Sequence, residues 1–312
     1  MNWIVDYIVF PLVFPGFLFA AAAGMLSSWL DRKITARIQW RRGPPLLQPV
    51  YDVFKLLGKE TLVPAGASQT TFLLAPLAGM AAATLVSTLV WVSMLWPDRG
   101  FVGDFFVVLY FLMVPSVAVI VGGFASKNPL ASLGASREMK LMLAYELPFL
   151  LAVMVPVIQS GGAVRLGELN AHQALNGPVA GSVSGILALV AVVMVVQAKL
   201  TLVPFDMPEA ETEIMGGTFV EYSGPPLAVY KLTRMMMQFT LPAAVVLLFL
   251  GGVRFSGWSM LWSILKFVLL LLAMTLIRNT NPRLRIDQAM KWFWGPVTFL
   301  AVCAVVLAFL KR

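Results

Sequence analysis

The stretch that decides the fold is Lys199-Leu-Thr-Leu-Val-Pro-Phe-Asp-Met-Pro-Glu-Ala-Glu-Thr-Glu-Ile-Met-Gly-Gly-Thr-Phe-Val-Glu-Tyr-Ser-Gly-Pro-Pro226, which separates two apolar runs, 182–203 and 227–251. Runs of about 20 apolar residues are long enough to cross a bilayer as helices. The stretch between them holds five of the 15 acidic residues of the chain: Asp206, Glu209, Glu211, Glu213 and Glu221. A carboxylate cluster between two membrane helices is a candidate for charge chemistry.

Similar apolar runs fill the rest of the chain. Hydrophobic residues make up 59% of the 312 residues and charged residues 12%, whereas soluble domains carry about 25% charged residues. A β-barrel would show short alternating segments instead. We therefore predict an all-α, polytopic membrane protein that forms one integral membrane domain over residues 1–312. Its eight expected transmembrane helices cover roughly 4–30, 71–96, 105–126, 139–160, 182–203, 227–251, 258–278 and 289–310.

The basic residues predict the orientation in the membrane. Most of the 23 Lys and Arg residues flank every second connection between the expected spans, and such residues favour the cytoplasmic side. No signal peptide precedes the first run, so we expect that run to remain as a span. We therefore expect a multi-pass protein of the cytoplasmic (inner) membrane with both termini outside. Its expected cytoplasmic segments are 31–70, 127–138, 204–226 and 279–288.

The first cytoplasmic segment contains more than a loop. Val50, Val53, Phe54 and Leu57 recur at helical spacing after Pro49, with charged residues on the other faces. This pattern is typical of a short amphipathic helix that lies in the membrane interface.

Two charged residues fall inside expected spans. Glu146 lies two turns into the fourth span, just before Pro148, and Lys266 lies in the middle of the seventh. Ionisable side chains at that depth are costly and are functional candidates by default. The alternative is a structural role, such as the pairing of Lys266 with a carboxylate or a backbone carbonyl.

The acidic stretch has two interpretations. If it is helical, Glu209 and Glu213 share a face, and crowded carboxylates of this kind could exchange protons near neutral pH. The alternative is a solvated acidic loop. Against it, the acids alternate with apolar residues and lie on the side that favours bases: Phe205, Met207, Ile214, Met215 and Phe219 interrupt them.

Basic segments lie on the same expected side. Residues 31–42 carry five bases, among them Arg32, Arg37 and Arg42, and residues 279–288 add Arg283, Arg285 and Asp287. These bases either anchor the topology or form a docking surface that pairs with the acids.

Cysteine and histidine usage narrows the chemistry. Cys303 and His172 are the single members of their kinds, whereas iron–sulfur clusters and zinc sites take several such ligands. We expect no metal and no cofactor in this chain. The bases flank membrane spans, which argues against a nucleic-acid partner.

Four separated motifs occur in order along the chain: Asp31-Arg32 with Ala36-Arg-Ile-Gln39 and Arg42-Gly-Pro44; Ser126-Lys-Asn-Pro-Leu130 leading to Ala144-Tyr-Glu-Leu-Pro148; Pro204-Phe-Asp-Met-Pro-Glu-Ala-Glu-Thr-Glu213 with Glu221-Tyr-Ser-Gly224; and Arg283-Leu-Arg-Ile-Asp-Gln288. Together they resemble the subunit 1 family of respiratory complex I, which comprises the H-type subunits of NADH-quinone oxidoreductases.

Departures from the quinone-linked branch favour the branch of energy-converting, membrane-bound nickel–iron hydrogenases and formate hydrogenlyase. Lys199-Leu-Thr-Leu-Val203 stands where the quinone branch usually has Glu-Thr-Asn-Arg-Ala. Pro45 and Glu138 replace the Asn and Gln usual there, and Gly224-Pro-Pro226 resembles the hydrogenases.

The resemblance implies a membrane-anchor and coupling subunit without a redox centre. Its partners would be the hydrogenase large subunit and the small iron–sulfur subunit on the cytoplasmic side, and antiporter-like subunits in the bilayer. The acidic stretch would sense the redox event, Glu138 and Glu146 would carry protons inward, and Lys266 would respond. The alternatives are a quinone-linked NADH dehydrogenase subunit and a purely structural anchor; a stand-alone transporter lacks support, since no internal repeat is visible.

Overall fold

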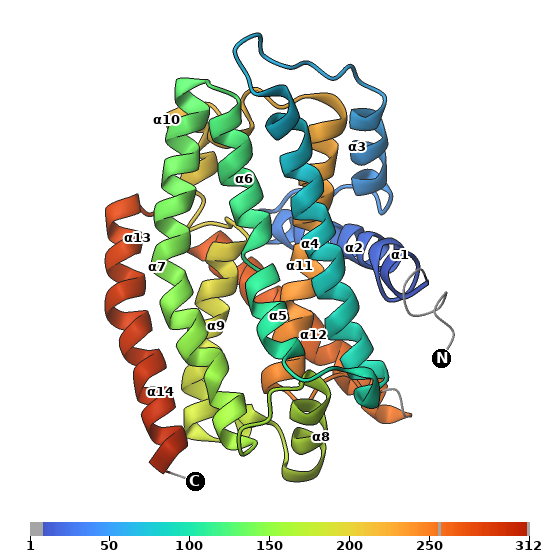
Figure 1. Cartoon of the computed structure of the whole chain (residues 1–312), viewed down its shortest axis with the longest axis vertical. Helices are drawn as coiled ribbons and strands as arrows, with labels where there is room; N and C mark the ends of the chain where they lie inside the picture. Colours follow the sequence, from blue (N-terminus) through green and yellow to red (C-terminus); the bar gives the residue numbers. More distant parts are fainter. Residues whose placement is uncertain (1–8, 255–256, 311–312) are drawn as a thin grey trace.

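The computed structural model describes residues 9–254 and 257–310, and within these ranges it contains helices and no strand. The all-α prediction is therefore confirmed (Figure 1). The helices are α1 Phe10–Leu12, α2 Phe17–Ile38, α3 Gln48–Leu57, α4 Gln69–Leu95, α5 Asp104–Phe111, α6 Val114–Ala125, α7 Pro129–Gln159, α8 Leu166–Asn176, α9 Val183–Lys199, α10 Glu211–Ile214, α11 Gly224–Phe249, α12 Trp258–Thr280, α13 Ile286–Trp292 and α14 Thr298–Leu310.

Seven helical segments of the described part are long and apolar enough to span a membrane, and α9 is a shorter apolar helix of 17 residues. α5 and α6 together form one of the seven, as do α13 and α14 with the π-helical turn between them. α9 occupies the position of the predicted fifth span. The first span, Phe10–Ile38, ends further along the chain than the predicted residue 30. Residues 4–8 of the prediction lie outside the described ranges.

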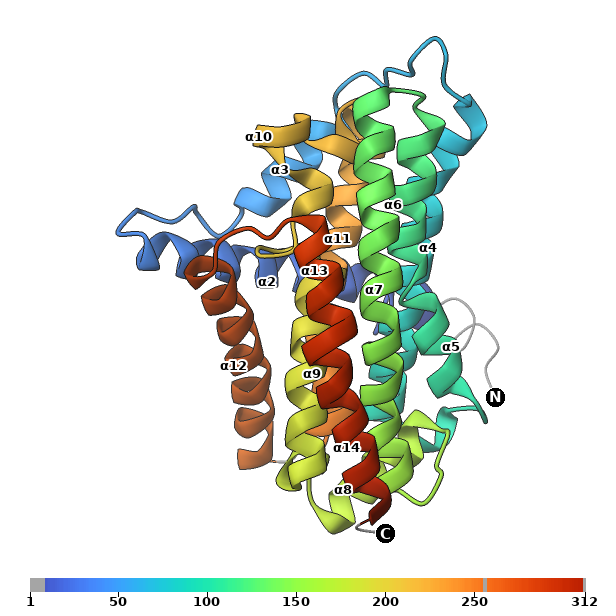
Figure 2. The ribbon, with the colours of Figure 1, turned by 90° about the vertical axis from the view of Figure 1, so that its left-hand side faces the viewer.

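α11 is the centre of the bundle. In the apolar window of α11, 83% of residues are buried, against 22% for α12. α11 packs on α2, α4 and α9, while α12 contacts mainly α2 and α11. Figure 2 shows α12 standing to one side of the bundle that α7, α9 and α14 form. Most long helices run along the same axis, but α2 lies across them.

The crossing of α2 over α11 depends on a small residue. A Cβ atom on Gly24 would lie 2.5 Å from the carbonyl oxygen of Met235. Small residues at helix crossings in membranes let two backbones approach closely. Gly24 therefore allows α2 to lie against the backbone of α11.

The expected amphipathic helix is present as α3, which packs on α2 and α11. Val53 is buried, while Phe54 and Leu57 are 67% and 47% exposed. Only part of the apolar face therefore packs on the protein, and the rest is free to contact lipid or a partner.

Two predicted loops are partly helical. The segment 127–138 is a loop only up to Asn128, since α7 begins at Pro129 and the side chain of Asn128 accepts the N–H of Leu130. Proline at the first helical position and an asparagine cap are typical of a helix start. Similarly, α2 continues to Ile38, well into the predicted loop 31–70.

Residues far apart in sequence meet at one end of the molecule. α3, α10 and the start of α7 lie at the upper end of Figure 1, and α8 lies at the other. Leu284 donates its N–H to the carbonyl of Pro204 at 3.0 Å, which joins the α12–α13 connection to the acidic stretch.

The Gly24 crossing gives a stability prediction. Gly24→Ala should lower the free energy of unfolding by about 1–3 kcal/mol, because the added methyl group overpacks two backbones. Gly66→Ala is the matched control, since a Cβ there meets no atom within 4 Å. Thermal unfolding of the detergent-solubilised complex would measure both; equal midpoints would contradict this account of the crossing.

Candidate functional site

A cavity of about 310 Å³ lies between the acidic segment (residues 206–221), α6, α7, α11 and the end of α9. Its wall carries six charged residues: Glu138, Lys199, Glu209, Glu211, Lys231 and Arg234. Apolar side chains fill the spaces between these groups: Leu112, Val119, Phe219, Leu227 and Met237. The cavity thus joins the acidic segment to charged residues of the membrane helices.

Glu209 and Glu213 do not share a helical face, so that prediction is wrong. Glu209 ends a 3₁₀ turn, and Ala210 has ψ 101° before α10 begins. This extended residue interrupts the helix and turns the two carboxylates apart. Glu209 pairs with Arg234 beside the cavity, while Glu213 pairs with Arg137 on the outside.

The other acids of the segment have separate partners. Asp206 pairs with Arg283 at 2.9 Å. Glu221 accepts a hydrogen bond from the side chain of Asn128. Glu211 is exposed at the cavity wall. Four of the five acids, Asp206, Glu209, Glu213 and Glu221, thus each bind a different side chain. The segment is therefore more ordered than a solvated acidic loop.

Burial changes the titration of Asp206. Removal from water raises the pKa of its carboxyl above the usual value, and Arg283 offsets part of this increase. One carboxylate oxygen of Asp206 is buried without a hydrogen-bond partner. Asp206 can therefore hold the segment in place through Arg283 when ionised.

α7 brings two carboxylates into the bundle. Glu138 is 1% exposed, and its Oε2 atom has no hydrogen-bond partner. Glu146 pairs with Lys199 of α9, with 2.8 Å between Oε2 and Nζ. The ammonium also lies 4.9 Å from the ring centre of Tyr145 and 4.6 Å from that of Phe149. Glu146 thus lies inside the bundle, and the buried ammonium of Lys199 compensates its charge.

Lys266 lies away from this site. Its ammonium donates to the carbonyl of Leu250, directly after the end of α11. Cations near a helix C-terminus stabilise the last carbonyls. This is the backbone-carbonyl pairing that formed the structural alternative for Lys266, and no carboxylate pairs with it within the described ranges.

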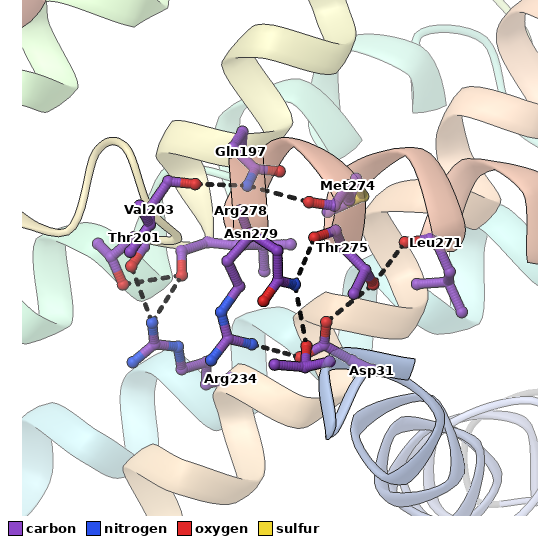
Figure 3. Close-up of polar contacts among 12 residues, drawn as sticks. Asp31, Gln197, Thr201, Val203, Arg234, Leu271, Met274, Thr275, Arg278 and Asn279 are labelled. Carbon is purple, nitrogen blue, oxygen red and sulfur yellow. Dashed lines mark hydrogen bonds and ion pairs between the residues drawn. The ribbon is translucent and has the colours of Figure 1, made fainter. Parts of the chain in front are cut away.

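The chain after α9 is held by side chains from two helices, α9 and α11 (Figure 3). Arg234 donates to the carbonyls of Leu200 and Thr201 at 3.0 and 2.9 Å. Gln197 donates to the carbonyl of Val203 at 2.8 Å and to that of Met274 at 3.3 Å. These bonds satisfy backbone groups that lose their helical partners where α9 ends.

Some side chains of residues 31–42, called the basic segment from here on, form ion pairs. Arg32 binds Asp52 of α3 at 2.9 Å and so ties α3 to α2. Partial burial alone would raise the pKa of Asp52, but hydrogen bonds from Arg32 and Gln48 outweigh it and hold this pKa below its usual value. Arg37 and Arg42 are exposed and have no ion pair among the described residues, which leaves them available for a partner.

A second buried ion pair links α2 to α12. Asp31 is 6% exposed and accepts hydrogen bonds from Thr275, at 2.9 Å, and from Arg278 (Figure 3). In the α12–α13 connection, Arg283 reaches the acidic segment, whereas Arg285 pairs with its exposed neighbour Asp287 at 3.4 Å.

Sequence reasoning missed three important partners. Lys199 and Arg234 look like topology-setting bases in the sequence, and no pattern distinguishes Asn128. One signal was available for Lys199: it ends an apolar run, and Glu146 in another run needs a cation. No sequence signal pairs Arg234 with Glu209, which lies 25 residues earlier.

The arrangement suits proton transfer and charge compensation. Glu138 and Glu209 line the cavity, and the buried ammonium of Lys199, which also lines it, binds Glu146. No group of three or more His, Cys, Asp or Glu side chains is arranged to hold a metal ion within 9–254 and 257–310.

The Asp206–Arg283 pair gives a pH prediction. A carboxyl with a raised pKa stabilises the fold at low pH, and this contribution is lost as pH rises through the folded-state pKa. Arg283→Met should raise that pKa further. The acidic segment should then lose about 1 kcal/mol or less of local stability at pH 8 and little at pH 5.

Hydrogen exchange of the amides of Phe205, Asp206, Met207 and Glu209 would measure this difference. Arg285→Met is the control, because its partner Asp287 is exposed. A loss that is equal at both pH values would show that Arg283 does not act through the charge of Asp206.

Comparisons with known proteins agree with this geometry. The chain matches the NADH dehydrogenase family over residues 12–309. The NADH-quinone oxidoreductase H subunit 2 of Syntrophobacter fumaroxidans is 35% identical over 305 residues, with 89% of this chain and 88% of the relative covered. The corresponding H subunit of Geobacillus kaustophilus is 34% identical over 293 residues, with 89% and 86% covered.

A solved structure has the same fold. A chain of the membrane-bound sulfane sulfur reductase, an archaeal respiratory membrane complex, superimposes with a TM-score of 0.80 and 27% identity. The match covers 93% of this chain and 96% of that one. The helical arrangement, the family match and the sequence identity lead to one conclusion: the chain belongs to the NADH dehydrogenase family, as a membrane subunit similar to the H subunits of NADH-quinone oxidoreductases.

Proposed function

We propose that this chain is the membrane-anchor and coupling subunit of a complex I-like, ion-translocating oxidoreductase. The observation that carries the proposal is the cavity that joins Glu209 of the acidic segment to Glu138 of α7. The Glu146–Lys199 pair lies further along the same helix. Ionisable residues that face a cavity inside a bundle are typical of proton paths.

The acids take two roles in this proposal. Glu209 and Glu211 border the cavity and respond to charge changes above it. Glu213 and Glu221 bind Arg137 and Asn128 and hold the surface on which a partner docks. Asp206 and Arg283 fix the segment in position. Lys266 stabilises the end of α11 in this scheme, because its ammonium binds a carbonyl there.

The docking surface is the side of the molecule that carries α3, α10 and the basic segment (residues 31–42), at the left of Figure 2. Exposed Arg37 and Arg42 of that segment suit acidic partner surfaces. In our proposal this side faces the cytoplasm, both termini lie outside, and the large and small redox subunits dock here. The chain itself would hold no metal or cofactor, and antiporter-like subunits would pack beside it in the bilayer.

We further propose a hydrogenase-type complex. The departure from the quinone-branch motif at 199–203 falls on the cavity, because Lys199, Leu200 and Thr201 line its wall. The structural relative is named for sulfane sulfur reduction rather than for quinone. The second candidate is a quinone-linked NADH dehydrogenase subunit, which the names of the sequence relatives favour.

The electron acceptor separates these two candidates. The purified complex would be tested with reduced methyl viologen for hydrogen evolution, and with NADH and a short-chain quinone for quinone reduction. We expect hydrogen evolution and no quinone reduction. Quinone reduction without hydrogen evolution would assign the chain to the quinone branch.

The coupling role has its own test. Glu209→Gln and Glu146→Gln should each lower the number of ions pumped per electron at least tenfold while electron transfer continues, because each removes an ionisable group from the path. Reconstituted complexes in vesicles would report pumping and electron transfer together.

Glu168→Gln is the control, since Glu168 is an exposed residue of α8 at the opposite end of the molecule. Unchanged pumping per electron in both path variants would leave only the structural-anchor function.

A further inference from the structure

Lys199 is a single cation close to two carboxyl groups, those of Glu146 and Glu138. Its Nζ atom lies 2.8 Å from Oε2 of Glu146, and its side chain also lines the cavity that contains Glu138. The Oε2 atom of Glu138 and the Oε1 atom of Glu146 are both buried without hydrogen-bond partners. Each carboxyl group therefore has an oxygen that can still accept a bond from an ammonium.

The charges of the group do not balance if every member is ionised. Two carboxylates and one ammonium leave one excess negative charge in an apolar bundle, and an uncompensated buried charge is strongly unfavourable. One of the two carboxyl groups therefore carries a proton. Because Lys199 binds Glu146, the proton resides on Glu138 in this arrangement.

Neighbouring groups leave this balance unchanged. Glu209 and Arg234 face the same cavity and compensate each other. Tyr145 lies beside the ammonium and is neutral. Glu211 and Lys231 line the outer part of the cavity, where both are exposed.

The surroundings allow the ammonium to move. A lysine side chain is a flexible four-carbon stem that ends in a compact charge. The rings of Tyr145 and Phe149 flank the ammonium and can stabilise it away from a carboxylate. Glu138 and Glu146 lie eight residues apart, about 12 Å along α7. The cavity of about 310 Å³ reaches Glu138 and the side chain of Lys199, although not Glu146, and it has room for several water molecules. A proton released by Glu138 would pass through these waters and then along the Lys199 side chain to Glu146.

We propose that Lys199 is a mobile counter-charge that alternates between Glu146 and Glu138 and so moves one proton along α7. When the ammonium leaves Glu146 for Glu138, Glu138 releases its proton to cavity water and becomes the anion. Glu146 takes up one proton and becomes neutral. The number of protons and the net charge are the same before and after, while the proton has moved two helical turns inward. The inference rests on the proposed coupling function and gives it a mechanism.

Infrared spectroscopy of the assembled complex tests this directly, since a neutral carboxyl group gives a C=O band that an ionised one lacks. Glu138→Gln identifies the band of Glu138 by its loss. In Glu146→Gln, the ammonium has no anion there and should move to Glu138, which then ionises and loses its band. In the double variant Glu146→Gln with Lys199→Met, the band of Glu138 should return.

A fixed lysine predicts the opposite. An ammonium that stays beside residue 146 lies about 12 Å along α7 from Glu138 and attracts its charge only weakly, so the band of Glu138 would persist in Glu146→Gln. This result would overturn the proposal. So would a double variant that lacks the band. Lys140→Met is the control: this exposed lysine of α7 has no ion pair among the described residues, and its loss should leave the band unchanged.

Pumping per electron, measured on the same samples, separates the two proposals. The expected band changes with unchanged pumping would support the mobile lysine and contradict the coupling function. Lost pumping with a band of Glu138 that persists in Glu146→Gln would support coupling and overturn the mobile lysine. If Lys199→Met alone fails to assemble, the double variant still decides the question, because it leaves no charge of this ion pair unpaired.

Discussion

Where a helix ends inside an apolar bundle, its last backbone carbonyls need other hydrogen-bond partners. The candidate site lies around one such helix end, that of α9. α9 ends at Lys199, well below the end of the neighbouring α7 (Figure 2). The carbonyls that follow are bound by Arg234 and Gln197. An unwound backbone is tolerated at this depth only where protein groups or a cavity satisfy it. The short helix therefore leaves room for the acidic segment to fold inward and line a cavity.

Charge pairing follows from the same constraint. A cation that binds the carbonyls after α9 is itself costly unless a carboxylate compensates it, and Glu209 meets this need for Arg234. Lys199 and Glu146 compensate each other in the same way deeper in the bundle. Glu138 is the exception, since no ion pair forms with it in the described structure. Because its carboxyl group has no cationic partner, Glu138 is suited to binding and releasing a proton.

The rest of the fold positions this region. α11 carries Arg234 through the centre of the bundle, and Gly24 lets α2 lie directly on it. α2 in turn carries Asp31 and Arg32, which bind α12 and α3. The basic segment, the amphipathic helix and the acidic segment therefore lie on the same side of the molecule (Figure 2), although up to about 190 residues separate them in the chain. A partner docked on this side would contact elements that lead directly to the cavity.

The sequence alone determined the all-α membrane fold, because runs of apolar residues leave few other ways to satisfy a backbone in lipid. It also determined α3, through its helical periodicity, and it identified the acidic segment and Glu146 as charges that need an explanation. It could not assign partners. Glu146 and Lys199 are 53 residues apart and Glu209 and Arg234 are 25 apart. Rules based on helical spacing relate only residues three or four apart, so they cannot predict these pairs. The predicted shared face of Glu209 and Glu213 failed because Ala210, which lies between them, leaves the helical conformation with ψ 101°. Only the tertiary structure decided which carboxylates face the cavity and which face outward, because these choices depend on helices that the chain brings together from distant positions.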